Sequence, residues 1–293
     1  MRGNGFLYPR FALGILAVSF GAIFARLAGE ASPFAIAAWR LTLAALVLAP
    51  FTLFRSERSL DRESFLWSLL SGAALSVHFV LWIWSLDYTT VASSVLFVST
   101  HPIFVGFGSI LFLRERLSRR LLAGIVLAVA GGALIGFGDV QIGGSALRGD
   151  LLALGGGLMA AVYFLIGRRV RRKVSLPEYV AVTYGTAAAL VLLLCLVTRT
   201  PVLGYAPSTY GYLVLLAVVP QLIGHSTINW ALKRLSASRV SIFVLGEPVG
   251  SALLAIAFFR EVPVGLNLLG AAIILVGIYL SLKGEEGQDG TES

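Results

Sequence analysis

The stretch STHPIFVGFGSILFLRERLS, residues 99–118, has a counterpart later in the same chain, LGEPVGSALLAIAFFREVPV, residues 245–264. In both, a proline stands early in an apolar run that ends with Arg-Glu. Pro102 and Pro248 lie 146 positions apart, as do Glu115 and Glu261. At this offset, twelve residues are identical over positions 84–131. An apolar composition can explain chance matches of Leu, Ile and Val, but it does not explain matches of Trp, Pro, Arg-Glu and two glycines at the same offset. We therefore predict that the chain contains a duplicated unit.

The composition indicates that lipid is the main solvent of this chain. Of its 293 residues, 57% are hydrophobic and 13% are charged, and the mean hydropathy is +0.87. Soluble domains carry about 25% charged residues. The net charge of +8 comes from short basic clusters between apolar runs, and this pattern does not predict a nucleic-acid partner. The single cysteine, Cys195, excludes an internal disulfide framework and any CxxC metal motif.

The apolar residues fall into ten runs, most of them close to the roughly 17–25 residues that a membrane-spanning helix needs. Backbone groups in lipid must be satisfied within the chain, so we predict that these runs are helices. The sequence therefore predicts an all-α integral membrane protein with ten transmembrane helices. The predicted spans are 11–28, 33–54, 65–86, 91–113, 121–137, 151–167, 179–197, 210–230, 240–259 and 264–282.

The basic residues predict the orientation. Eighteen of the 23 Lys and Arg residues fall in segments on one side, four fall on the other, and Arg40 lies within a predicted span. Lys and Arg accumulate on the cytoplasmic side, so both termini are expected there. We predict two five-helix repeats, residues 1–140 and 141–283, followed by a polar tail, residues 284–293. Because five is odd, the second repeat is inverted, which is typical of transporters with a substrate site near the midplane.

Polar residues inside the predicted spans are candidates for substrate binding, because such residues are unfavourable in lipid. His78 and Trp82 share one helix face, and His225 and Asn229 repeat their spacing. We expect Pro102 and Pro248 to kink their helices and free carbonyl groups toward a cavity, or else to serve packing only. The role of Arg40 stays open. The predicted substrate-binding residues are His78, Trp82, His101, Tyr163, Tyr184, His225, Asn229 and Glu247.

The sequence carries no motif for an enzyme, a metal site or a cofactor. HExxH, GxSxG and Walker patterns are absent, and no acidic cluster accompanies the three histidines. We therefore expect neither catalytic residues nor a bound metal or cofactor. A channel-like facilitator remains an alternative, as does an antiporter of nucleotide sugars or other metabolites. A nucleotide-sugar carrier would need basic residues in its cavity, and only Arg40 is available.

Two longer segments resemble a known family. WSLDYTTVASSVLFVSTHPIFVGFGSILFLRERLSRRLLAGIVLAVAGGALI and WALKRLSASRVSIFVLGEPVGSALLAIAFFREVPVGLNLLGAAIILVGIYL are similar to the paired motifs of EamA-type members of the drug/metabolite transporter superfamily. Within it, the chain most resembles bacterial amino-acid exporters of the YddG type. The resemblance implies ten helices around a central cavity that opens alternately to each side of the bacterial inner membrane. It also implies export of small metabolites, here amino acids including aromatic and other neutral ones, without ATP hydrolysis. We further expect a monomer.

Overall fold

The computed structural model describes residues 7–53, 60–113, 118–142, 144–262 and 265–285, and within them the regular structure is entirely helical. Glu115 and most of the predicted polar tail, residues 284–293, lie outside the described residues. The elements are α1 (Leu7–Ser19), α2 (Gly21–Leu27), α3 (Pro33–Leu53), α4 (Arg62–Ser85), α5 (Val91–Val98), α6 (His101–Gly108), η1 (Ser109–Leu113), α7 (Arg119–Ile142), α8 (Gly144–Arg171), α9 (Leu176–Val197), α10 (Pro207–Leu216), η2 (Ala217–His225), α11 (Ser226–Ala231), α12 (Ala237–Val244), α13 (Gly246–Phe259) and α14 (Gly265–Glu285).

Eight stretches of the described chain are helical, long and apolar enough to cross a membrane. Some of them join consecutive elements, for example α5, α6 and η1 in Val91–Leu113. These eight agree with eight of the ten predicted spans. The other two predicted spans coincide with α7 and α14, which are also helices. The prediction of an all-helical membrane protein is confirmed, and the count of ten spans stays a prediction.

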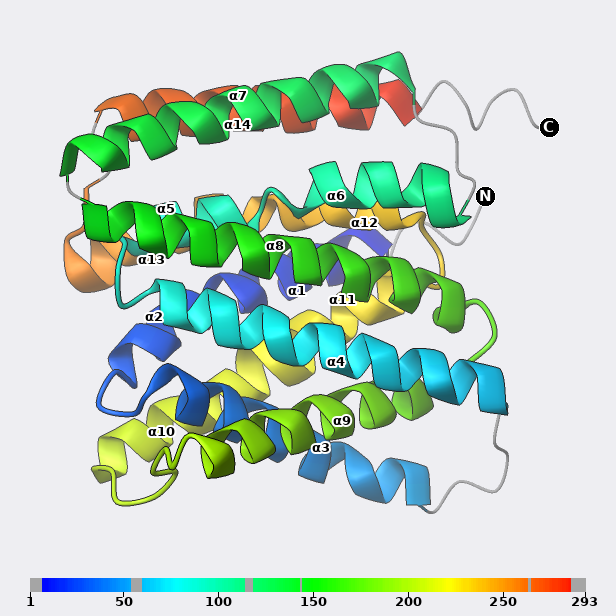
Figure 1. Ribbon diagram of the computed structural model, residues 1–293. Helices are drawn as coiled ribbons and strands as arrows, with labels where there is room; N and C mark the ends of the chain where they lie inside the picture. The colour runs from blue at the N-terminus through cyan, green and yellow to red at the C-terminus, as the bar shows by residue number, and fades with distance from the viewer. Residues whose placement is uncertain (1–6, 54–59, 114–117, 143, 263–264, 286–293) are drawn as a thin grey trace.

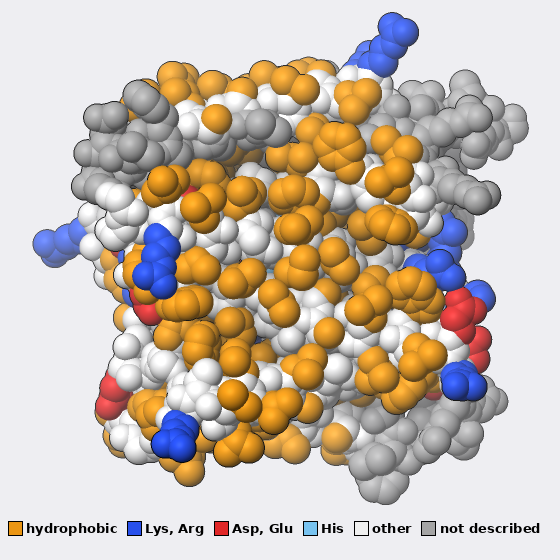
Figure 2. Space-filling view, in the orientation of Figure 1, with side chains coloured by type: hydrophobic (Ala, Val, Ile, Leu, Met, Phe, Trp, Pro, Cys, Tyr) orange, Lys and Arg blue, Asp and Glu red, His pale blue; other side chains and the backbone are white. Residues whose placement is uncertain are grey.

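The face of the bundle seen in Figure 2 is apolar between two polar ends. Among the described residues, side chains such as Leu13, Leu66, Leu111 and Leu193 are more than half exposed. Lys, Arg, Asp and Glu side chains gather toward the two edges of the view, which are the ends of the helices. An apolar belt of this kind matches a surface that faces lipid chains, because lipid does not penalise exposed leucine.

α7 and α14 pack against each other along their length and form a layer at one side of the bundle (Figure 1). Gly131 of α7 lies so close to α14 that an added Cβ atom would be 2.5 Å from the carbonyl oxygen of Gly270. Both glycines belong to the set matched at the 146-residue offset. Small residues allow such close approach in membranes, where helix pairing depends on van der Waals contact.

The two prolines of the repeated stretch lie just after an interruption of their helices. α5 ends at Val98, and α6 starts at His101 with Pro102 in its first turn. In the second copy, Leu245 separates α12 from α13, and Pro248 lies in the first turn of α13. Proline is tolerated in the first helical turn because no intrahelical bond needs its missing N–H. In each copy the interruption of the helix therefore falls two or three residues before the proline.

A carboxylate between two helices binds the start of a distant helix. Glu30, between α2 and α3, accepts hydrogen bonds from the Thr209 hydroxyl at 2.6 Å and the Ala206 backbone N–H at 2.9 Å. Both bonds favour the ionised carboxylate and lower the pKa of Glu30 below its usual value. The contact joins the start of α10 to a segment about 180 residues earlier, at the end of the bundle opposite to the start of α1 (Figure 1).

Gly72 gives a test of the packing between α4 and α9. An added Cβ there would lie 2.6 Å from the carbonyl oxygen of Thr183 and equally near the Thr186 side chain. We expect Gly72→Ala to destabilise the protein by about 1–3 kcal/mol because the two helices must move apart. Thermal unfolding of purified protein in detergent would show this as a lower Tm. Gly185→Ala on α9 is the matched control, since nothing lies within 4 Å of its added Cβ, and equal Tm values for the two variants would contradict the packing described.

Candidate substrate cavity

A buried cavity lies where the central helices of both halves of the chain meet. Its volume, measured as the space open to the centre of a water molecule, is about 30 Å³. A space of this size holds one or two water molecules. We call the cavity contracted because this space is smaller than an amino acid. The lining residues are Val18, Arg40, His78, Phe79, Trp82, Val98, Ser99, His101, Ala160, Tyr163, Phe164, His225, Ile228, Val244 and Glu247.

Six of the eight predicted substrate-binding residues line this cavity. They come from α4, α6, α8, η2 and α13, so residues far apart in the sequence meet here. They are His78, Trp82, His101, Tyr163, His225 and Glu247.

Asn229 and Tyr184 lie in a layer behind the cavity and do not line it. The Asn229 amide donates to the Tyr163 hydroxyl, to the Tyr184 hydroxyl at 3.4 Å and to the His225 carbonyl at 2.9 Å. The Tyr184 hydroxyl also lies 3.3 Å from the Ser226 hydroxyl. The Asn229 amide nitrogen and the Tyr184 hydroxyl have protein partners, whereas Oδ1 of Asn229 has none among the described residues. We interpret both side chains as supports that hold Tyr163 and His225 in place.

The prolines also lie away from the cavity lining. Pro102 is buried at the start of α6. Pro248 faces a separate apolar groove between α5, α13 and α14. His101 and Glu247, the residues directly before them, do line the cavity. The role of the two prolines as helix kinks stays a prediction.

Aromatic rings form one wall of the cavity. The His78 and Trp82 rings are parallel to within 2°, with centroids 6.2 Å apart, as their four-residue spacing on α4 predicts. The His225 ring lies 5.1 Å from the Phe79 ring and 6.3 Å from the His78 ring. Nδ1 of His78 is 2.9 Å from the carbonyl oxygen of Gly156, so its ring is fixed against α8.

Arg40 is the charged group at the centre of this arrangement. It is 1% exposed, and its Nε donates to the Gln221 side chain at 2.8 Å. The guanidinium carbon lies 3.9 Å from the centre of the Phe79 ring, which is a cation–π distance. Glu247 lines the same cavity. Arg40 thus ties α3 to η2 and also presents positive charge to the cavity.

Several buried polar atoms at the cavity have no hydrogen-bond partner among the described residues. They are Nη1 of Arg40, Nε1 of Trp82, Oγ of Ser99, Nε2 of His101 and Nδ1 of His225. The backbone of Ser241 lies near His101, but no bond to it meets ordinary hydrogen-bonding geometry. An unpaired buried polar group carries a penalty of about 1–3 kcal/mol. Because these unpaired atoms gather at one cavity, we infer that a polar ligand or water supplies their missing hydrogen bonds.

Sequence reasoning missed Gln221, which is fully buried in η2 and holds Arg40. A signal existed, because Gln221 is an amide inside an apolar run, directly after Pro220. The π-helical geometry of η2, which turns Gln221 and His225 inward, has no signature in the sequence pattern. Phe79 and Phe164 were likewise indistinguishable from ordinary packing residues.

The sequence profile of the EamA-like transporter family matches twice, at residues 9–137 and 147–283. The chain belongs to the EamA-like transporter family. It is therefore a multi-pass membrane protein of a transporter family, and that family is not one of enzymes. The resemblance noted from the two motif segments is confirmed.

Relatives of this EamA-like chain are transporters from several organisms. One from Archaeoglobus fulgidus, described as an uncharacterized transporter, is 26% identical over 260 residues, which cover 86% of this chain and 88% of the relative. A probable terminal-alkyne amino-acid exporter from Streptantibioticus cattleyicolor is 27% identical over 253 residues, covering 82% and 81%. A solved crystal structure aligns with a TM-score of 0.73 at 24% identity, covering 95% of this chain and 98% of the other, and supports the fold.

Proposed function

We propose that this protein is a secondary transporter that exports amino acids, including aromatic and other neutral ones, by alternating access through the central cavity. The observation that carries the proposal is the set of five unpaired polar atoms at one cavity that both halves of the chain line. The amino-acid exporter among the relatives supports the substrate class.

The cavity matches the two charges of a free amino acid. Nη1 of Arg40 and Nε1 of Trp82 are donors, so they suit a carboxylate. The Glu247 carboxylate is an acceptor for an ammonium group. The surrounding rings of Phe79, His78 and Phe164 offer apolar surface for a side chain. Substrates with one carboxylate, one ammonium and an apolar side chain fit this distribution.

The same proposal includes the topology. Ten spans as two inverted five-helix repeats, with both termini in the cytoplasm of a bacterial cell, are supported by the distribution of basic residues. The double match of the family profile also supports a duplicated unit. α1 begins and α14 ends at the same end of the bundle (Figure 1), as an even number of crossings requires. Binding of an amino acid would require the contracted cavity to widen toward one side.

Flux through purified protein in liposomes tests this function. With no ATP present, radiolabelled phenylalanine, threonine or methionine should accumulate in vesicles preloaded with the same unlabelled amino acid. The rate should saturate with concentration, because a carrier must bind its substrate in every cycle. Flux that never saturates would instead indicate a channel, and counterflow of nucleotide sugars without counterflow of amino acids would refute the substrate class.

A further inference from the structure

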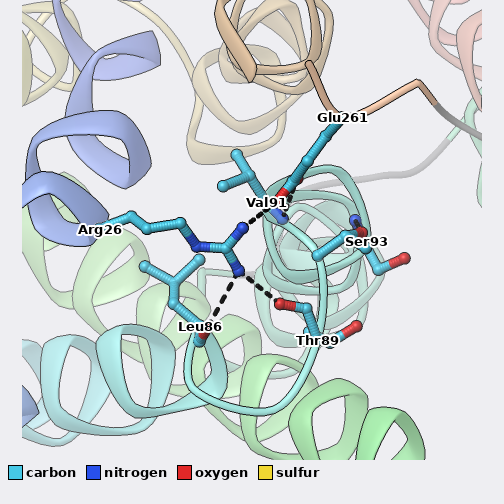
Figure 3. Close-up of polar contacts among 7 residues, drawn as sticks. Arg26, Leu86, Thr89, Val91, Ser93 and Glu261 are labelled. Atoms are coloured by element: carbon cyan, nitrogen blue, oxygen red, sulfur yellow. Dashed lines mark hydrogen bonds and ion pairs between the residues drawn. The ribbon is translucent and has the colours of Figure 1, made fainter. Parts of the chain in front are cut away.

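An ion pair joins the two halves of the chain at one end of the bundle. Arg26, in the last turn of α2, pairs through Nη1 with the Glu261 carboxylate, which follows α13 (Figure 3). Both side chains are 24% exposed, so water screens the pair only in part. The guanidinium carbon also lies 5.7 Å from the centre of the Phe259 ring. Arg26 thus contacts the second half of the chain through an ion pair with Glu261 and a cation–π contact with Phe259.

Each side chain of the pair also completes a helix end. Nη2 of Arg26 donates to the carbonyl of Leu86 at 3.0 Å and to that of Thr89 at 2.7 Å, at the C-terminal end of α4. The second oxygen of Glu261 accepts from the Val91 backbone N–H at 3.0 Å, at the start of α5 (Figure 3). Terminal backbone groups of a helix lack intrahelical partners. One ion pair therefore gathers the ends of α2, α4, α5 and α13.

The helices gathered here line the central cavity farther along the bundle. Trp82 lies on α4, Val98 ends α5 and Glu247 lies on α13, and all three are cavity residues. Gly21, the first residue of α2, is so close to the Trp82 ring that an added Cβ would be 3.1 Å away. Separating these helix ends would open a route from this end of the bundle to the cavity.

The second copy carries a related contact, which indicates that the arrangement is part of the duplicated unit. Nη1 of Arg168 donates to the carbonyl of Leu232 at 2.9 Å. Leu232 lies 146 positions after Leu86, and Arg168 lies 142 positions after Arg26. The two matches of the family profile start 138 positions apart and end 146 apart, so 142 is an intermediate offset. Each copy thus uses an arginine to cap the same turn, and in the first copy this arginine also binds Glu261.

We propose that Arg26 and Glu261 are the closing contact of a gate between the cavity and the outer face of the membrane. The inference rests on the alternating-access part of the proposed function, and it assigns the contracted cavity to a state closed at this end. The Arg26–Glu261 pair is partly buried and has charge-assisted hydrogen bonds, so it stabilises the closed state. Loss of this pair should shift the population toward the outward-open state.

Alkylation of a cavity cysteine measures this opening without any substrate. The reporter is Ser99→Cys in a Cys195→Ala background. Ser99 lines the cavity, is 2% exposed, and its hydroxyl has no partner among the described residues, so cysteine is a mild change. A membrane-impermeant maleimide is added to intact cells. We expect Glu261→Gln and Arg26→Gln each to speed labelling about tenfold, as the loss of a charged hydrogen bond implies.

The matched control is Glu63→Gln, which removes the exposed ion pair with Arg169 at the other end of the bundle. It should leave the labelling rate unchanged. The Arg26→Gln, Glu261→Gln double variant should label no faster than the faster single variant, because both break one contact. Normal elution on size exclusion shows that the variants are folded.

Unchanged labelling in both single variants, additive effects in the double variant, or faster labelling only in inside-out vesicles would each overturn the gate. The result is independent of the substrate class. Faster labelling in a protein that fails to exchange amino acids would refute the proposed substrate and keep the gate. Unchanged labelling in a protein that exchanges phenylalanine would refute the gate alone.

Discussion

Replacing Arg40 by glutamine should reduce counterflow of phenylalanine by at least about a hundredfold. Arg40 presents the positive charge of the central cavity, and Glu247 faces the same space. In the proposed site, the substrate carboxylate would lose its charged donor. Removing one partner of a buried charge pair typically costs about 3–5 kcal/mol, because the other charge is left uncompensated. Arg40→Lys keeps the charge but not the fork of donors, so we expect it to retain part of the activity.

The measurement is initial counterflow in liposomes with matched amounts of protein, after size exclusion has shown that each variant is folded. Arg234→Gln is the control, because Arg234 is an exposed arginine that stacks on Trp230 at 4.1 Å, away from the cavity. Its transport should equal that of the parent. Full activity in a folded Arg40→Gln protein would remove Arg40 from the site.

Replacing Glu247 by glutamine should change which molecules the protein accepts. The proposed role of its carboxylate is to bind the substrate ammonium group, and a hydrogen bond to a charged group contributes about 1.5–3 kcal/mol. We therefore expect the affinity for phenylalanine to fall about tenfold to a hundredfold. 3-Phenylpropionate, which keeps the ring and the carboxylate but has no ammonium group, should compete poorly in the parent and gain relative to phenylalanine in the variant.

Competition against radiolabelled methionine gives both affinities in one assay. Glu63→Gln serves as the control acid, since Glu63 is exposed and paired with Arg169 at a helix end. It should leave the preference for phenylalanine unchanged. An equal loss of affinity for phenylalanine and 3-phenylpropionate in Glu247→Gln would assign Glu247 a structural role and leave the ammonium group to another residue.

The membrane class and the residues of the cavity could be predicted because both depend on the contrast between polar side chains and lipid. His78, His101, His225 and Glu247 stand out in apolar runs, and the structure brings all four to one cavity. The spacing of four between His78 and Trp82 correctly placed them on one face of α4. Such features follow from the pattern of polar and apolar residues over short stretches of the sequence.

Features that depend on long-range geometry could not be predicted. Glu261 reads as an interfacial acid next to Arg260, yet its partner is Arg26, which lies 235 positions earlier in the chain. Asn229 and Tyr184 had the right chemistry for binding, but tertiary packing directs their polar groups to each other and to Tyr163. The inward turn of Gln221 depends on the π-helical stretch around Pro220. None of these follows from hydrophobic periodicity.

The central claim is that amino acids bind in the cavity shared by the two halves. Counterflow of radiolabelled phenylalanine through His78→Ala, His101→Ala and Tyr163→Ala tests it most directly, with Trp67→Phe as the comparison. Trp67 lies under the Arg169 guanidinium, 4.7 Å from it, near a helix end and outside the cavity lining. Each cavity variant should lose at least about fivefold in transport, as expected for one buried hydrogen bond, while Trp67→Phe stays near the parent. Parent-like transport in the three cavity variants, together with loss in Trp67→Phe, would place the substrate site elsewhere.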